Sequence, residues 1–319
     1  TADGKSVILI THKLKEITAS SDNCTIIRQG KYIQTVKVAD VNENELAAMM
    51  VGRDVNFKVD KKDQEPGEVV LDIEDLHAKD YRGVEILKGF HLNVRRGEIV
   101  GLAGVDGNGQ TELVEVLTGL RKAESGKVTM LGKDVFNKTP KETFESGISS
   151  IPADRQKHGL ILEFSNEDNL ILQHFEEEPY SSHGILNRKA IKGHAEELIE
   201  KFDVRPRGCG ESPAGTLSGG NQQKVIIARE VTNDKELLIA VNPTRGLDVG
   251  AIEFVHKYLV EQRNKNRAVL LASFELDEIM SLSDRIEVIF DGQITGSVAG
   301  KDADEKELGF MMAGGKTNE

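Results

Sequence analysis

The segment from Gly104 to Thr111 reads GVDGNGQT and nearly has the composition of a phosphate-binding loop. In the pattern G-x-x-x-x-G-K-[ST], glycines let backbone N–H groups face phosphate oxygens, a lysine reaches the outer phosphates, and a hydroxyl reaches Mg²⁺. Gly104 and Gly109 occupy the glycine positions and Thr111 the hydroxyl position, but Gln110 replaces the lysine. The loop can therefore surround a phosphate, but it lacks the cation.

A second polar segment has chemistry suited to phosphate. It starts at Leu217 and reads LSGGNQQKVIIARE, so that Ser218, Gly219 and Gly220 stand at the start of an expected helix. A hydroxyl, glycine N–H groups and the positive end of a helix all favour an anion. A third segment, LLIAVNPTRGLDVGA, is an apolar strand followed by polar residues.

The elements that must position these segments follow the pattern of an α/β protein. Alternating runs at 69–78 and 86–94 predict an antiparallel strand pair. Continuous apolar runs near 97–104, 237–244 and 267–274 predict parallel strands that are covered on both faces. The sequence therefore predicts an α/β fold with a mainly parallel central sheet and an antiparallel β layer. Further strands are expected at 127–135 and 147–154, and helices at 111–120 and 196–204.

The two ends of the chain resemble each other. KSVILITHKLKEITASSDNCTIIRQGKYIQTV, from Lys5, aligns without gaps with RAVLLASFELDEIMSLSDRIEVIFDGQITGSV, from Arg267. Further along, ENELAAMM aligns with EKELGFMM. Each copy predicts strand, helix, strand, turn, strand and helix, so the chain contains part of one domain and the whole of a second copy.

Three segments follow from this repeat. Residues 1–59 are predicted to be the C-terminal remnant of a first domain, and 69–319 a complete second one. Residues 60–68 are charged, contain Pro and Gly and lack periodicity, as expected of a linker. The absence of an initiator Met also indicates a fragment of a longer polypeptide.

Composition excludes several classes of protein. Hydrophobic residues are 38% and charged residues 29% of the 319, a balance typical of globular proteins. The net charge of −12 disfavours a nucleic-acid partner, because phosphate backbones bind to clustered Lys and Arg. Apolar runs such as VILI and LLIAV are far shorter than the ~20 residues of a membrane span. Cys24 and Cys209 are the only cysteines and lie far apart, which favours a reduced cytoplasmic protein.

Taken together, the segments resemble those of ATP-binding cassette (ABC) proteins. LSGG is similar to the family's signature motif, and PTRGLDVG is similar to its Walker B extension and D-loop. The resemblance covers the whole chain and implies a P-loop NTPase-type ABC cassette with a helical subdomain at about 160–230. Within the family, GVDGNGQTELVEVLTGL and NPTRGLDVGAIEFVHKYL look most like tandem-cassette subunits that import simple sugars or nucleosides.

The second copy departs from the family at five functional positions. Gln110 replaces the lysine, Val241 the Walker B aspartate, Asn242 the catalytic glutamate, Phe274 the switch histidine, and Ala153 the polar Q-loop residue. Metal-assisted hydrolysis of ATP needs a cation, a carboxylate near Mg²⁺ and a group that orients water. This cassette is therefore expected to hydrolyse ATP very slowly or not at all.

The resemblance implies a division of labour, because paired cassettes hold each ATP between the Walker motifs of one and the signature of the other. Ser218, Gly219 and Gly220 would then contact ATP and Mg²⁺ held by a first cassette. His12 aligns with Phe274 and would be the catalytic switch histidine of that first cassette. The loop at 104–111 would be a structural relic or a weak nucleotide holder.

Several assignments have simpler alternatives. Thr111 is a weak candidate for a metal ligand and could instead cap a helix; Asp248 could face the partner cassette or cap the next helix. Tyr81 could stack on adenine or be a plain core or surface residue, and His12 could be an ordinary surface histidine. Asp154, Arg155 and Lys157 should face the membrane partner or form a solvated cluster. The nucleotide-binding set is Tyr81, Gly104, Gly107, Asn108, Gly109, Gln110, Thr111, Leu217, Ser218, Gly219, Gly220 and Asp248.

The leading functional prediction is an ATP-binding subunit of a nucleoside importer, located in the cytoplasm on the inner face of the membrane. The resemblance implies a first cassette on the same polypeptide, a transmembrane permease and, indirectly, an extracellular substrate-binding protein; nucleic acid is not expected. An importer of ribose- or galactose-type sugars is the alternative. A soluble ABC protein of ribosomes or DNA, and a nucleotide-binding regulator, are further hypotheses that the acidic charge and the LSGG segment disfavour.

Overall fold

A computed structural model describes residues 4–28, 30–54, 61–62 and 64–315. The chain forms two compact units: a small unit of residues 1–58 with 246–254, and a large unit of residues 59–245 with 255–319. Among the described residues, every helix is too short or too polar to cross a bilayer.

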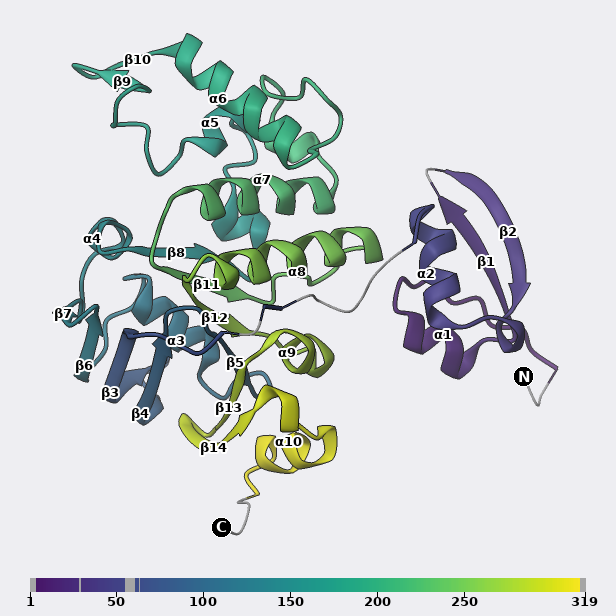
Figure 1. The fold of residues 1–319 in the computed structure, drawn as a ribbon, viewed down its shortest axis with the longest axis horizontal. Coiled ribbons are helices and arrows are strands. Elements are labelled where there is room, and N and C mark those ends of the chain that lie inside the picture. Colours follow the sequence, from purple (N-terminus) through teal and green to yellow (C-terminus); the bar gives the residue numbers. More distant parts are fainter. Residues whose placement is uncertain (1–3, 29, 55–60, 63, 316–319) are drawn as a thin grey trace. The chain divides into compact units, whose positions relative to one another are not determined.

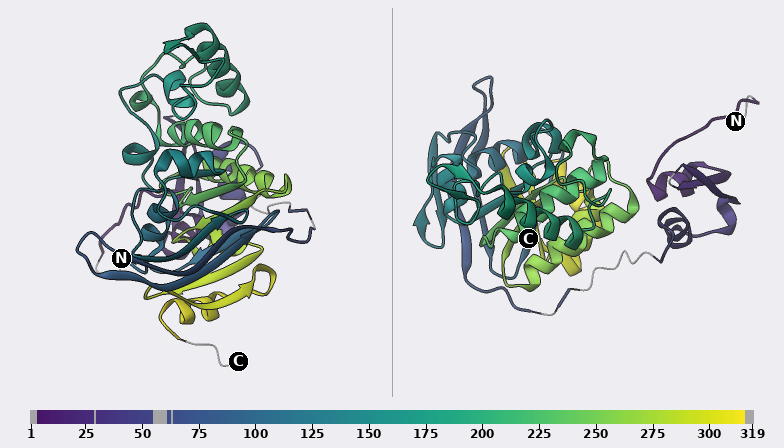
Figure 2. Two further views of the ribbon diagram at one scale, coloured as in Figure 1. Left: turned by 90° about the vertical axis from the view of Figure 1, so that its left-hand side faces the viewer. Right: turned by 90° about the horizontal axis from the view of Figure 1, so that it is seen from above.

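A six-stranded sheet forms the centre of the large unit (Figures 1 and 2). Its strand order is β14-β13-β5-β12-β11-β8, and only β14 runs antiparallel to its neighbour. Every residue of β5, β11 and β12 is buried, as the continuous apolar runs predicted. The strands are β5 (Ile99–Ala103), β8 (Ile148–Ile151), β11 (Leu237–Val241), β12 (Ala268–Ala272), β13 (Arg285–Phe290) and β14 (Gln293–Ala299).

A second, antiparallel sheet has the order β4-β3-β6-β7. Its apolar face and the central sheet enclose one hydrophobic core, in which Phe90 and Leu102 are fully buried. The prediction of an α/β fold with a mainly parallel sheet and an antiparallel layer is confirmed. The strands are β3 (Val69–Lys79), β4 (Glu85–Arg95), β6 (Ser125–Met130) and β7 (Lys133–Asp134).

The helices from α3 onward fall into two groups; the first residues of α8 belong to the small unit and the rest of it to the large unit. α5, α6 and α7 gather with the short strands β9 (Ser181–Ser182) and β10 (Ile185–Leu186) at the end opposite α10, as Figures 1 and 2 show. The remaining helices belong to the sheet region. The helices are α3 (Gln110–Leu117), α4 (Pro140–Glu145), α5 (Asn166–Leu170), α6 (Arg188–Lys201), α7 (Gly219–Thr232), α8 (Val249–Asn264), α9 (Leu276–Leu282) and α10 (Glu305–Met312).

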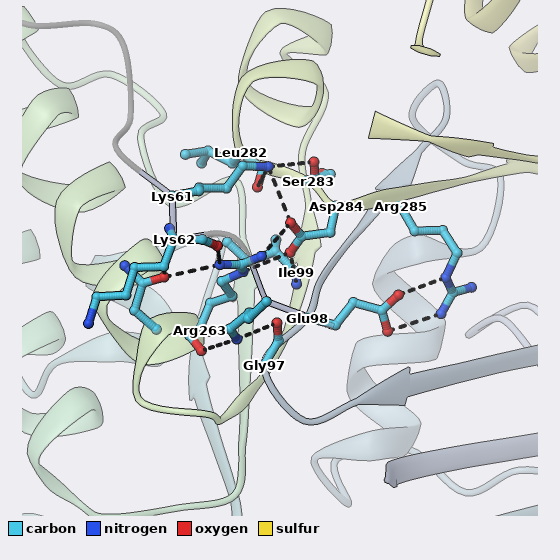
Figure 3. A network of polar contacts seen from close by, with 12 residues as sticks. Lys61, Lys62, Gly97, Glu98, Ile99, Arg263, Leu282, Ser283, Asp284 and Arg285 are labelled. Atoms are coloured by element: carbon cyan, nitrogen blue, oxygen red, sulfur yellow. Dashed lines mark hydrogen bonds and ion pairs between the residues drawn. The ribbon is translucent and has the colours of Figure 1, made fainter. Parts of the chain in front are cut away.

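The described part of the predicted linker is bound to the large unit (Figure 3). The ammonium of Lys61 donates to the carbonyl of Ser283 at 2.8 Å and lies 3.4 Å from the carboxylate of Asp284. The same carboxylate accepts the N–H of Ile99 at 2.9 Å and two guanidinium N–H groups of Arg263 at 3.1 and 3.0 Å. Asp284 therefore joins the linker, the end of α8 and the start of β5. Residues 59, 60 and 63 lie outside the described residues.

The small unit repeats the end of the large one element by element. It contains α1 (Leu14–Ser20), β1 (Asn23–Arg28), β2 (Lys31–Lys37) and α2 (Glu43–Val51), and each begins where the sequence alignment places α9, β13, β14 and α10. Even the irregularity in the β1–β2 ladder, between Ile26 and Ile27, is matched between Val288 and Ile289 of β13. The predicted repeat is confirmed over these elements.

The prediction of a strand at the start of the small unit is wrong. The run VILI lies outside any helix or strand, and Val7, Ile8 and Ile10 are 80%, 91% and 95% exposed. Its counterpart β12 lies between β11 and β5, and its residues are buried because the faces of this sheet are covered; Ala268, Leu270 and Ala272 belong to the core of the large unit. Among the described residues of the small unit, the sheet consists of β1 and β2, so VILI has no such parallel neighbours.

Candidate functional site

The loop between β5 and α3 has the backbone of a phosphate-binding loop. Gly107 and Gly109 have φ of +88° and +110°, in the left-handed region that favours glycine. A Cβ on Gly104 would lie 2.5 Å from Nε2 of Gln110 and 2.7 Å from Cγ2 of Ile289. Each of the three glycines is therefore required by conformation or close contact, as the sequence pattern predicted.

Asn108 braces this loop. Its Oδ1 accepts the N–H of Asp291 at 2.9 Å, its Nδ2 donates to the carbonyl of Val105 at 3.2 Å, and its own carbonyl accepts the N–H of Gly292 at 3.1 Å. These bonds fasten the loop to the turn between β13 and β14. Asn108 was predicted as a nucleotide contact, and in the structure its side chain is engaged in holding the loop.

Gln110 lies beneath the loop. Its side chain is 3% exposed, and neither Nε2 nor Oε1 has a hydrogen-bond partner among the described residues. A buried amide without partners costs about 1–3 kcal/mol, so this position does not contribute to stability through its polar atoms. An amide also carries no charge, so the Coulombic contact that a lysine makes with phosphate is absent.

The predicted metal position opens into a cavity of about 460 Å³ that Thr111, Ala153 and Val241 line. The structure thus brings these three predicted positions together. Val241 and Ala153 offer no oxygen ligand, and the described residues contain no metal-binding cluster of His, Cys, Asp or Glu. Thr111 does not cap α3 either, because the N-cap is Gly109. The residues present therefore do not fit a tightly held Mg²⁺, which prefers several oxygen ligands.

Asn242 binds the loop that follows β12. Its Oδ1 accepts the N–H of Phe274 at 2.9 Å, and its own N–H donates to the carbonyl of Ala272 at 2.7 Å. The residue has a left-handed φ of +43° and is buried. Where a carboxylate would orient water, this amide connects two loops of the fold. Phe274 is 40% exposed and offers no polar side-chain atom to a phosphate.

The LSGG segment leads directly into α7. Leu217 is buried, Ser218 is the exposed N-cap residue, and Gly219 and Gly220 are the first residues of the helix. The Ser218 hydroxyl accepts Nδ2 of Asn221 at 2.9 Å and forms no capping bond to the helix backbone. A helix N-terminus of this kind presents N–H groups and partial positive charge to an anion.

The comparisons with known proteins identify the family. The family described as ABC transporter matches residues 87–245. The chain carries an ABC transporter ATP-binding domain. The match covers the loop at 104–111, the LSGG segment and β11.

Related proteins align over almost the whole chain. It is 52% identical to the nucleoside import ATP-binding protein NupA of Lactococcus lactis, covering 99% of this chain and 62% of that protein. It is 54% identical to the guanosine import ATP-binding protein NupO of Bacillus subtilis, with 99% and 62% covered. Identity to the glucose import ATP-binding protein TsgD13 of Haloferax volcanii is 44%, with 99% and 58% covered. The chain thus spans less than two thirds of these relatives.

Solved structures support the fold. An ATP-binding cassette of an ABC transporter in its ADP conformation matches with a TM-score of 0.62 at 23% identity, covering 77% of this chain and 95% of that one. A nucleotide-free ATP-binding cassette matches with a TM-score of 0.63 at 24% identity, with 77% and 96% covered. The large unit therefore has the architecture of an ABC cassette.

Two buried glutamines connect the signature helix α7 to neighbouring segments, and no sequence pattern indicated this role. Gln222 is 1% exposed and accepts Nε2 of Gln156 at 3.2 Å; Gln223 is 3% exposed and donates to the carbonyl of Pro243 at 2.9 Å. The signature is thereby held to the segment after β8 and to the segment after β11.

Asp154 has an extended backbone and is the N-cap residue of the short helix at 155–159. Its Oδ1 accepts the N–H groups of Lys157 and Gln156 at 3.0 and 3.1 Å. Hydrogen bonds from these backbone groups, first that of Lys157, hold the pKa of the carboxyl below its usual value. The carboxylate is thus engaged by backbone N–H groups of its own segment.

Two further candidates are Tyr81, on the turn between β3 and β4, and Asp248, directly before α8. Tyr81 is 87% exposed with the guanidinium of Arg82 5.6 Å from its ring centre, so the core alternative is wrong and adenine stacking stays a prediction. Asp248 accepts the N–H of Ala251 at 2.9 Å, which confirms the helix-capping alternative.

His12 and Phe274 occupy equivalent turns in the two copies. Thr11 precedes His12, and its hydroxyl accepts the N–H of Lys13 at 3.1 Å. Ser273 precedes Phe274, and its hydroxyl accepts the N–H of Glu275 at the same distance. This shared turn supports the alignment on which the prediction for His12 depends, while its catalytic role stays a prediction.

Proposed function

We propose that the chain belongs to an ATP-binding subunit of a nucleoside importer, in which this cassette hydrolyses ATP poorly and supplies its signature to a first cassette. The observation that carries the proposal is the contrast between the two phosphate-binding segments. The metal cavity has lost its carboxylate at Val241, and the loop has lost its cation at Gln110. The signature keeps an exposed Ser218 and two glycines at a helix N-terminus.

A composite site explains why the signature keeps its phosphate-binding residues while the glycine loop and the metal position do not. Gln110 and Val241 would act on a nucleotide of this cassette, whereas Ser218 would act on the nucleotide of a partner. ATP and Mg²⁺ would therefore be held mainly by the partner's Walker motifs, with the hydroxyl and N–H groups of the signature completing the shell around the outer phosphate. His12 would supply the switch imidazole of that partner site.

The small unit is consistent with being the end of that first cassette. The exposed run VILI corresponds to β12, which is the centre of a parallel sheet in the second copy. An exposed apolar run of this kind is suited to forming a strand between two further strands. Residues 1–59 would then be the remnant of the first cassette, 60–68 the linker, and 69–319 the second cassette with its helical subdomain near 160–230.

The cavity that Thr111, Ala153 and Val241 line is also suited to a permease. Its walls include apolar Leu120, Phe144 and Ile148 and charged Asp154 and Lys157. A largely apolar groove with charged edges can receive a helix of a membrane subunit. The protein would then lie in the cytoplasm on the inner face of the membrane, with an extracellular substrate-binding protein on the other side of the permease.

The choice of solute rests on the relatives. Two relatives above 50% identity are named for nucleoside and guanosine import, and a relative at 44% is named for glucose import. Nucleosides are therefore the favoured solutes, and a simple sugar is the second candidate. A ribosome- or DNA-directed protein is disfavoured by the net charge of −12.

Uptake measurements test this function. Cells that express the full-length protein with its permease should take up labelled nucleosides, and unlabelled nucleoside should compete where ribose and glucose do not. The Ser218→Arg variant is the matched control, because its bulk and charge at the signature should abolish uptake without touching the permease cavity. Competition by sugars alone would establish the second candidate, and recovery of the protein with ribosomes in place of a permease would contradict both.

A further inference from the structure

Arg155 lies directly against the signature motif. A Cβ on Gly219 would be 2.7 Å from Nη2 of Arg155 and 3.2 Å from its Cζ, so the guanidinium fills the space beside the first residue of α7. This contact requires glycine at 219 unless the arginine moves. Arg155 lies after β8, far from the signature in the sequence, and only the fold brings Arg155 and Gly219 together.

The position of this guanidinium is fixed by one hydrogen bond. Its Nη1 donates to the carbonyl of Arg245 at 2.9 Å, in the segment that follows β11. Its Nε is buried and has no hydrogen-bond partner among the described residues. The side chain as a whole is half-buried, and its Nη2 lies beside the backbone of Gly219 at the start of α7.

The charge of Arg155 is not compensated within the part of the chain that the structure describes. The neighbouring carboxylate of Asp154 accepts backbone N–H groups, and none of the described ion pairs includes Arg155. The N-terminus of α7 adds partial positive charge at the same place, so an anion there would be stabilised from two directions.

From this geometry we propose that Arg155 is a further phosphate-binding residue of the composite site. The proposal rests on the proposed function, in which Ser218 and the glycines meet the outer phosphate of ATP held by the first cassette. Arg155 donates N–H groups to the same phosphate from its place beside Gly219, and the Arg245 carbonyl holds it there. The degenerate cassette thus contributes a cation to its partner's nucleotide while lacking one at its own Gln110.

The test uses the full-length protein in complex with its permease and compares Arg155→Gln and Arg155→Lys with Arg207→Gln. Arg207 is an exposed arginine of the same helical region and serves as the control. Loss of a charge-assisted bond to the outer phosphate should raise the KM for ATP on the order of tenfold in the glutamine variant and less in the lysine variant. The inhibition constant for ADP should not change, because ADP lacks that phosphate.

The outcomes separate the inference from the function on which it rests. An unchanged KM, an equal loss of ADP affinity, or a loss confined to permease binding would each overturn the role of Arg155. If Arg155→Gln does not fold, the lysine variant decides: its KM for ATP should rise, by less than tenfold, while the inhibition constant for ADP stays unchanged. Ser218→Arg is measured alongside: full ATPase activity in that variant would reject the composite site itself, and with it the inference.

Discussion

Removing the carboxylate of Asp284 should destabilise the large unit more than any surface ion pair. Arg263 is buried, with 5% of its side chain exposed, and its Nε and Nη2 both donate to this carboxylate (Figure 3). Asp284→Ala would leave that guanidinium buried without its counter-charge and the N–H of Ile99 without its acceptor. Breaking a buried pair by removing one partner costs about 3–5 kcal/mol, and we expect a loss of that size.

A graded series isolates the charge. Asp284→Asn keeps an oxygen that can accept the N–H of Ile99 and loses the charge, so a loss of about 1.5–3 kcal/mol is expected. Glu124→Ala is the control, because its pair with Lys79 is 51% and 47% exposed and such pairs contribute at most about 1 kcal/mol. Urea unfolding followed by circular dichroism gives the shift of the large unit's transition.

Hydrogen exchange provides a second, local measurement. The amide of Ile99 begins β5 and should exchange much faster in Asp284→Ala, while amides in the small unit keep their rates. Equal urea midpoints for Asp284→Ala and Glu124→Ala would refute the view that this carboxylate holds the linker, α8 and β5 together.

Two further predictions concern local stability. Burial lowers the pKa of His194, whose ring lies 5.2 Å from that of Tyr180, so the folded chain disfavours its protonated form. Unfolded histidine titrates near pH 6.5; as the pH falls through that value the unfolded state gains a proton that the folded state resists, and stability should fall. A urea midpoint that drops between about pH 7.5 and about pH 5.5 in the wild type but not in His194→Phe would confirm this. Asn42 forms a capping box with Glu45 at the start of α2, with bonds of 3.0 and 2.9 Å, and Asn42→Ala should cost the small unit about 1 kcal/mol by hydrogen exchange. Unchanged exchange in α2 would contradict that role.

Local pattern was sufficient to predict most of the fold. Continuous apolar runs identified β5, β11 and β12, because strands covered on both faces tolerate few polar residues. The internal repeat predicted α1, β1, β2 and α2 in the small unit. The prediction of a strand at VILI failed. An apolar run shows that a segment can form a buried strand, but it does not show whether the neighbouring strands are present.

The site was predictable only where spacing along the chain carries the chemistry. The glycine loop and LSGG are contiguous, so residue types alone indicated their conformation. The contact of Arg155 with Gly219 joins segments that the fold brings together from different elements, and no periodicity reports it. The hydrogen bond from Phe274 to Asn242 is likewise a tertiary contact that the sequence showed only as the loss of a carboxylate.

The division of labour between two cassettes is tested most directly by ATPase activity of the full-length protein in two variants. Gln110 is buried under a loop that lacks a cation and a metal ligand set, so Gln110→Ala should keep nearly all activity. Ser218 stands exposed at the start of α7, and Ser218→Arg should abolish activity by blocking the partner's nucleotide. Equal losses in the two variants would contradict the account.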